Sequence, residues 1–251
     1  MFSPELIHVT ARHAGSIIDQ LSGATDAPAQ NQGDIKMKTM IATAVVAAAL
    51  AAAGGASAAD FQPKAAGTWL VDVRATTVAP DESGDILTAG GVDSTLNVKV
   101  DNDTIPSLGI SYFVTDKIAV ELILGTSKHT VSATTLPAAT PVHDTWVLPP
   151  VLSVQYHPLP AARFSPYVGA GINYMIFYQG KDRNGFTVDL ENGFGYSLQA
   201  GADIALTGPW SLNVDVKKVF FDTDASINGG TLKSDVTLDP LVVSVGVGRK
   251  F

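Results

Sequence analysis

The segment 193–221 constrains the fold more than any other part of the chain, because apolar residues alternate there with small or polar ones. Every second residue is apolar over 196–206, and the same alternation resumes over 210–216. A period of two residues indicates β-strands, and Thr-Gly-Pro at 207–209 has the chemistry of a tight turn. The segment therefore predicts an antiparallel β-hairpin.

The length and the two faces of these strands point to a membrane. A strand in a soluble protein has about 5–6 residues, whereas a tilted strand that crosses a bilayer needs about 9–11. One face of the hairpin is apolar, and the other carries Gln199, Asp203, Asn213, Asp215 and Lys217. An apolar exterior with a polar lumen is typical of a transmembrane β-barrel.

Composition agrees with this prediction. The chain is 46% hydrophobic and only 16% charged, yet it has no run suited to a spanning helix outside the N-terminal region. Its net charge of −8 argues against a nucleic-acid partner. The absence of cysteine fits an oxidising envelope compartment.

Three regions are expected along the chain. Residues 37–58 resemble a secretory signal peptide, with Lys38, an apolar run over 40–53 and small residues over 56–58. Residues 1–36 show no sustained pattern and are expected to be a non-native or disordered extension, with translation starting at Met37. The alternative is a genuine extended signal region. Residues 59–251 are expected to form the barrel.

Seven connections that alternate between long and short separate eight predicted strands. The strands are expected at 67–78, 104–114, 118–130, 145–157 and 165–179, in the two arms of the hairpin, and in a last strand that ends at Phe251. The long polar connections, predicted to be loops, are 79–103, 131–144, 180–192 and 222–235. This plan predicts an all-β, eight-stranded antiparallel barrel in the outer membrane of a Gram-negative bacterium, surrounded by lipid and lipopolysaccharide.

Several segments in the same order resemble the outer membrane protein W family over 59–251. They are Thr-Asp-Lys-Ile-Ala-Val-Glu-Leu at 115–122, Leu-Pro-Pro-Val-Leu at 148–152, Ser-Pro-Tyr-Val-Gly-Ala-Gly-Ile-Asn-Tyr at 165–174, Leu-Asn-Val-Asp-Val-Lys-Lys at 212–218 and Leu-Asp-Pro at 238–240. Phe251 resembles the C-terminal signal that the barrel-assembly machinery recognises, although Arg249 departs from that pattern. The resemblance implies a barrel that admits small hydrophobic molecules, with a largely apolar cavity and a lateral exit into the membrane. It also implies links to stress adaptation and to phage or bacteriocin reception.

The polar residues predicted to face the lumen are the first candidate site. They are Asp72, Arg74, Glu121, Gln155, Asn173, Gln199, Asp203, Asn213, Asp215 and Lys217. They could line a permeation path. The alternative is that they pair across a closed lumen, because an eight-stranded barrel is just wide enough for side chains to fill it.

A proline pair marks a second candidate site. Pro149 and Pro150 remove two donors from the strand ladder, so Leu148, Val151 and Leu152 could border a lateral opening in the wall. The alternative is a bulge that only curves the strand.

Other chemistry finds little support in the sequence. His129 and His143 flank one long connection, but no third ligand follows at a fixed spacing, so no metal site is expected. No nucleophile elbow, paired catalytic carboxylates or phosphate loop is present, so we expect neither an enzyme nor a cofactor.

Three functions remain open from the sequence. The first is a narrow passive channel for small, mostly hydrophobic molecules. The second is a structural or receptor barrel with a closed lumen, whose extracellular loops bind a partner such as phage or bacteriocin. The third is a soluble barrel that binds an apolar ligand inside, which would turn Leu198, Ile204 and Val214 inward.

Overall fold

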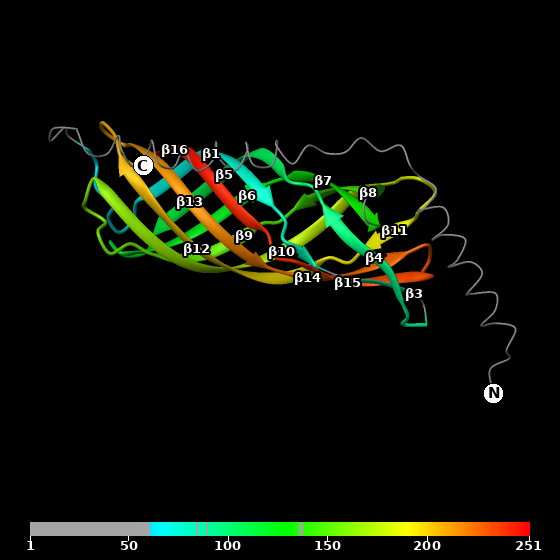
Figure 1. Cartoon of the computed structure of the whole chain (residues 1–251). Coiled ribbons are helices and arrows are strands. Elements are labelled where there is room, and N and C mark those ends of the chain that lie inside the picture. Colours follow the sequence, from blue (N-terminus) through cyan, green and yellow to red (C-terminus); the bar gives the residue numbers. More distant parts are fainter. Residues whose placement is uncertain (1–60, 84, 89, 136–137) are drawn as a thin grey trace, which may run out of the picture.

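The computed structural model describes residues 61–83, 85–88, 90–135 and 138–251, which form an elongated all-β molecule (Figure 1). The predicted extension at 1–36 and the predicted signal peptide at 37–58 lie outside the described residues. No helix among the described residues is long and apolar enough to cross a bilayer. The strands are β1 (Trp69–Ala79), β2 (Glu82–Ser83), β3 (Asp85–Thr88), β4 (Asp93–Val100), β5 (Asp103–Phe113), β6 (Ile118–Gly125), β7 (Ser127–Thr135), β8 (Ala138–Leu148), β9 (Val151–Tyr156), β10 (Phe164–Asp182), β11 (Val188–Leu190), β12 (Gly193–Ala205), β13 (Trp210–Phe220), β14 (Asp222–Ile227), β15 (Leu232–Leu238) and β16 (Leu241–Lys250).

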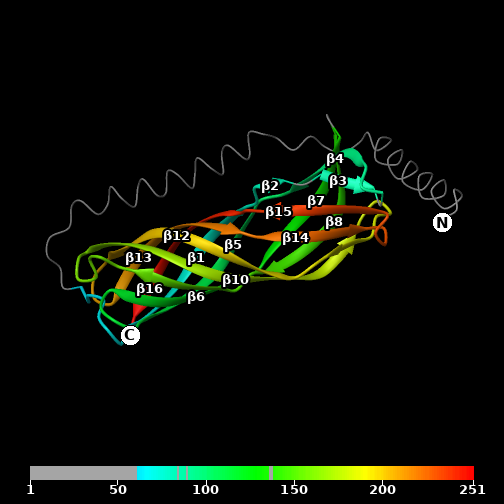
Figure 2. The same ribbon diagram turned by 90° about the horizontal axis from the view of Figure 1, so that it is seen from below.

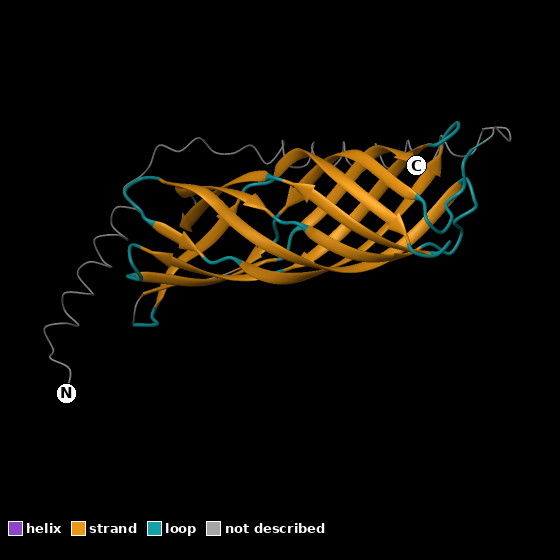
Figure 3. Ribbon diagram, turned by 180° about the vertical axis from the view of Figure 1, so that it is seen from behind, coloured by secondary structure: helices purple, strands orange, loops and turns teal. Residues whose placement is uncertain are grey.

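Eight of these strands close into a ring, here called the basal barrel. Each strand pairs antiparallel with the next in the order β1, β5, β6, β9, β10, β12, β13 and β16, and β16 returns to β1. Asp72 shows the closure, because it lies opposite Gly248 of β16 on one side and Gly109 of β5 on the other. Figure 3 shows the tilted strands of this ring at the end that carries the C-terminus. The prediction of an eight-stranded antiparallel barrel is confirmed.

The basal barrel turns its apolar face outward. Val73, Val168 and Leu198 are 63%, 57% and 55% exposed, whereas the polar residues between them are buried inside. A soluble protein rarely exposes so continuous an apolar surface. The soluble-barrel alternative required Leu198, Ile204 and Val214 to point inward. Leu198 points outward, and Val214 pairs with outward-facing Val245 and Ala202. Ile204 is only 6% exposed, but it follows inward-facing Asp203 on β12 and pairs with Phe164, which is 39% exposed.

The long connections are not loops for most of their length, which corrects the sequence prediction. Strands β3, β4, β7, β8, β14 and β15 occupy much of 79–103, 131–144 and 222–235, and the short strand β11 lies in 180–192. They continue the wall beyond the basal barrel and pair in the order β11, β14, β15, β3, β4, β7, β8 and the second half of β10. We call this second part the distal extension; Figure 2 shows it at the end away from the C-terminus.

These segments were predicted to be loops because they are polar. In the distal extension, however, the strands turn their polar residues outward and their apolar residues inward, which is the opposite of the basal barrel. In β14, Thr223, Ala225 and Ile227 are buried while the residues between them face outward. In β15, Leu232 and Val236 are buried while Lys233 is exposed. The outer surface is therefore polar and suited to water, and the inner surface is apolar. Ile86, Leu96, Ala133, Val142, Phe186, Val188, Ile227 and Leu232 form its core cluster.

The wall of the distal extension has one interruption among the described strands. The second half of β10 pairs with β8 on one side, and β11 pairs with β14, but no ladder joins β10 to β11 within the described residues. Side chains bridge this interval, since Asn192 accepts a hydrogen bond from the Phe177 amide at 2.8 Å and Asp182 accepts one from the Val188 amide at 3.1 Å.

Candidate functional site: an apolar cavity above a polar plug

All ten residues of the predicted polar lumen set point into the basal barrel. Each is at most 5% exposed. Period-2 alternation places them there, because each occupies the inward face of a strand whose neighbours face outward. The contacts of these residues describe what the set does inside the barrel.

Arg74 holds the centre of the polar lumen set. Its Nη2 atom donates hydrogen bonds to Glu121 Oε1 at 2.6 Å and to Asp72 Oδ2 at 3.1 Å. Gln199 Nε2 donates to the other oxygen of Glu121 at 3.1 Å, and Lys217 Nζ lies 3.8 Å from that oxygen. Polar and charged side chains from four strands, β1, β6, β12 and β13, thus meet across the lumen, as expected if the polar side chains pair with one another.

Glycines on the inward face make room for these long side chains. A Cβ atom on Gly109 would lie 2.7 Å from both Arg74 and Asp72. A Cβ atom on Gly201 would lie 2.5 Å from the ring of Tyr167, whose hydroxyl donates to Asp215 at 2.9 Å. The side chains of Arg74, Asp72 and Tyr167 therefore occupy the space that these glycines leave open inside the barrel.

A second polar cluster closes the end of the barrel that carries the short turns, and its central residue is not one that the sequence predicts for the lumen. Lys64 comes from the segment before β1, yet its side chain enters the barrel and lies 2.6 Å from Asp203. Its Nζ also donates to Ser165 at 2.9 Å and lies 3.0 Å from His157 Nδ1. No periodic pattern marks Lys64, because it lies outside a strand.

His157 stays neutral within this cluster. It follows β9 in a turn, and burial together with the neighbouring Lys64 ammonium lowers its pKa to about 4. Its Nε2 atom lies 3.1 Å from Gln155 Oε1, and its ring packs between Phe113 and Tyr167. The two polar clusters together form a plug that fills the basal lumen.

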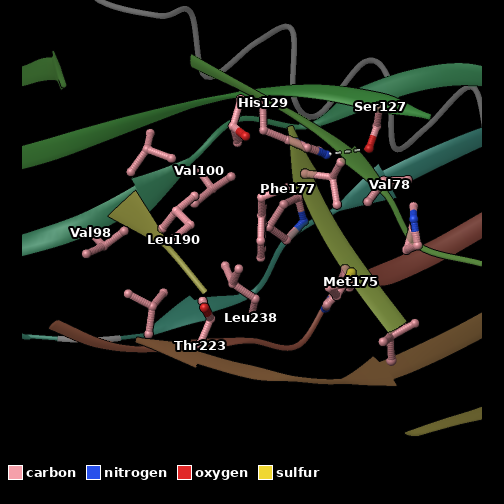
Figure 4. Close-up of a pocket in the computed structure, with 18 of the residues that line it drawn as sticks. Val78, Val98, Val100, Ser127, His129, Met175, Phe177, Leu190, Thr223 and Leu238 are labelled. Atoms are coloured by element: carbon pink, nitrogen blue, oxygen red, sulfur yellow. Dashed lines mark hydrogen bonds between the residues drawn. The ribbon is translucent and has the colours of Figure 1, made fainter. Parts of the chain in front are cut away.

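An apolar cavity of about 130 Å³ lies above the plug and extends into the distal extension. Figure 4 shows Val98 and Val100 of β4, Phe177 of β10, Leu190 of β11 and Leu238 of β15 pointing toward one another. An apolar cavity of about 150 Å³ is enough to bind benzene. This site was not among the predictions made from the residues, although the alternation of Leu232, Ser234 and Val236 with polar neighbours is a signal for it.

The floor of the cavity is polar. Asn173 and Lys217 both line it and are both 2% exposed. Neither Asn173 amide atom, nor Lys217 Nζ, has a hydrogen-bond partner among the described residues. By contrast, Thr76 at the same level shares hydrogen bonds with Ser107 at 2.6 Å and Ser244 at 2.9 Å. Two unsatisfied polar groups therefore face an otherwise apolar space.

The two histidines that flank 131–142 do not converge on a common site. His129 lines the cavity, where its ring nitrogens lie 2.7 Å from the Asp101 carbonyl and 2.8 Å from Ser127 Oγ. Burial lowers the pKa of His129, so the ring is neutral at pH 7. His143 instead pairs with Asp182 at 2.9 Å. No group of three acidic or histidine side chains suited to a metal ion occurs in the part of the chain that the structure describes.

The proline pair interrupts the wall between β8 and β9. Pro149 and Val151 line the cavity, whereas Leu152 is 48% exposed on the outer face. β10 crosses the break without interruption, because it pairs with Leu148 through Ile176 and with Leu152 through Ile172. The break thus brings residues of the cavity and of the lipid-facing surface together, with intact ladders above and below it.

Aromatic rings mark the rim near the C-terminus. Trp69 and Tyr112 pack with their centroids 4.8 Å apart, and both are exposed. The Arg249 guanidinium lies over the rings of Trp210 and Phe251 at 5.8 and 4.9 Å. This cation–π placement explains how a charge fits on the outer face two residues before the C-terminus.

Known proteins with similar sequences and structures are outer-membrane barrels. Residues 65–251 match the sequence model of the OmpW family. The chain is 36% identical over 223 residues to the outer-membrane protein y4mB of Sinorhizobium fredii, covering 83% of this chain and 95% of that protein. It is 32% identical to the dibenzothiophene metabolism operon protein PahQ of Pseudomonas aeruginosa, over 73% and 88% of the two chains. The crystal structure of the outer membrane protein OprG from Pseudomonas aeruginosa superposes with a TM-score of 0.72 at 33% identity, over 76% and 99% of the two chains.

Proposed function

Because this chain belongs to the OmpW family of outer-membrane barrels, which are not enzymes, we propose that it admits small hydrophobic molecules passively into the outer membrane. The observation that carries the proposal is the apolar cavity of the distal extension, closed below by the polar plug. A solute can leave water for this cavity at little cost, because apolar surface is buried there.

The plug argues against passage straight through the barrel. Moving an apolar molecule past Arg74, Glu121 and Lys217 would separate buried charges that contact one another. Breaking a buried ion pair costs several kcal/mol. An exit through the wall avoids this cost, and it suits a solute that partitions into lipid.

The interruption at Pro149 and Pro150 is the exit that we favour. Pro149 and Val151 border the cavity, while Leu148 and Leu152 lie on the outer, apolar side of the same wall. The strand ladder lacks two donors here, so the wall can part locally without breaking a continuous row of hydrogen bonds. Apolar residues then line the path from the cavity wall to the outer surface.

The relatives indicate which solutes to test. PahQ is named after an operon for the metabolism of dibenzothiophene, a fused and apolar aromatic molecule. Aromatic hydrocarbons and related heterocycles are therefore the first solutes to examine with this chain.

Uptake into liposomes that hold the refolded chain tests the proposal. A small hydrophobic fluorophore should enter faster than into empty liposomes, whereas a charged fluorophore of similar size should not. Ala225→Trp fills the cavity and should reduce uptake several-fold, while Ser226→Trp alters the next residue of β14, on the opposite face, and should not. Equal effects of the two variants would contradict the cavity route.

The exit has its own test. Replacing Pro149 and Pro150 by alanine restores two ladder donors and should slow the uptake of the hydrophobic probe while the barrel stays folded. Unchanged uptake would remove the proline break from the proposal but would leave the cavity in place. If neither probe enters a barrel shown to be folded, the receptor function of the distal extension becomes the better reading.

A further inference from the structure

The unsatisfied groups on the cavity floor define what kind of molecule the cavity can hold. Buried polar atoms normally find partners, because an unsatisfied group costs about 1–3 kcal/mol. Asn173 is 2% exposed, and both its amide oxygen and its amide nitrogen lack hydrogen-bond partners among the described residues. An oxygen atom of a bound molecule at this point would accept from the amide nitrogen, and a hydroxyl group could also donate to the amide oxygen.

The register places Asn173 beside the charged centre of the plug. Glu121 lies opposite Ser153, and Ser153 lies opposite Gly171 of β10. Asn173 is the next inward residue along β10 toward the cavity. Lys217 lines the same floor, and its Nζ lies 3.8 Å from both Glu121 and Asp215 without a hydrogen bond.

The charge of this centre selects against an acidic ligand. Asp72, Glu121 and Asp215 supply three carboxylates, whereas Arg74 and Lys217 supply two cations. A carboxylate placed at Lys217 would add a fourth negative charge to an already acidic group in a buried site. A neutral oxygen can accept a hydrogen bond from the ammonium or from the amide without that penalty.

We infer that the floor formed by Asn173 and Lys217 recognises a neutral oxygen group on the end of an otherwise apolar molecule, such as a phenol, an alcohol or a ketone. This inference rests on the proposed function and names its preferred solutes. The apolar walls hold the body of the molecule, and the floor orients its oxygen. A hydroxyl group can both donate to the Asn173 oxygen and accept from its nitrogen.

Binding of three matched ligands tests the inference with the barrel in lipid nanodiscs. Toluene, p-cresol and 4-methylbenzoate share one ring and differ in a hydrogen, a hydroxyl or a carboxylate. Affinities are compared between variants at the same lipid concentration, so that partition into lipid cancels. Side-chain amide signals of ¹⁵N-asparagine report contact directly, and the Asn173→Leu variant identifies the signal of Asn173.

We expect Asn173→Leu to weaken p-cresol binding about fivefold and to leave toluene within about twofold, as for one lost hydrogen bond. Met175→Leu, one inward position further along β10, is the matched control and should affect the two ligands equally. In the unaltered chain, p-cresol should shift the Asn173 signal while toluene does not, and 4-methylbenzoate should bind more weakly than p-cresol. The comparison of p-cresol with 4-methylbenzoate uses the unaltered chain alone, so it needs no variant to fold.

Two results would overturn the inference. One is an equal loss of toluene and p-cresol binding in Asn173→Leu, and the other is tighter binding of 4-methylbenzoate than of p-cresol. Failure of toluene to bind at all would refute the proposed function itself. The two failures are therefore distinguishable.

Discussion

Arg74 is the side chain whose removal should destabilise the barrel most, because it neutralises two buried carboxylates. Its side chain is 2% exposed, and those of Asp72 and Glu121 are at most 1% exposed. Arg74→Met keeps much of the volume but leaves both carboxylates facing each other without their shared cation. Removing one partner of a buried pair costs about 3–5 kcal/mol of unfolding free energy. We expect a loss in this range.

Urea unfolding in lipid vesicles, followed by the fluorescence of Trp69, Trp146 and Trp210, measures the loss. Lys218→Met is the control, since Lys218 pairs at 3.3 Å with Asp81, whose side chain is 80% exposed. An exposed pair of this kind contributes at most about 1 kcal/mol. Adding Asp72→Asn and Glu121→Gln to Arg74→Met should recover most of the loss, because no unpaired charge then stays buried. If Arg74→Met costs no more than Lys218→Met, the plug does not depend on this ion pair.

Three further predictions follow from the same interior. Gly201→Ala should cost about 1–3 kcal/mol in the same unfolding assay, because its Cβ would lie 2.5 Å from the Tyr167 ring and from the Val214 carbonyl; a neutral effect would show that Tyr167 moves freely. Lys64→Met should cost several kcal/mol by leaving buried Asp203 without its cation, whereas Lys64→Arg should retain part of the stability. The pKa of His157 is lowered to about 4, so the unfolded chain takes up a proton below about pH 6.5 while the folded chain does not. The stability present above pH 6.5 should therefore fall by about 2–3 kcal/mol toward pH 4. If the unfolding free energy of His157→Gln depends on pH as steeply as that of the unaltered chain, His157 is not the cause.

The sequence by itself determined the basal barrel and its polar interior. Strict alternation such as that of Leu198 and Ala200 with Gln199 fixes which side chains face lipid, because a slip of one residue would bury the entire apolar face. The same logic placed Asp72, Arg74 and Glu121 inside before any contact was known. Turn chemistry at 115–117 and 207–209 then fixed the order of the strands.

Only the tertiary structure decided which charges meet and where the cavity lies. Lys64 reaches Asp203 from 139 positions away in the chain, and no local pattern encodes such a contact. Composition predicts loops for the distal extension because its segments are rich in polar residues, although these residues share one face of each strand. Its strands follow the same two-residue period with the polar face outward, since water rather than lipid surrounds them, and that reversal creates an apolar cavity above a polar plug.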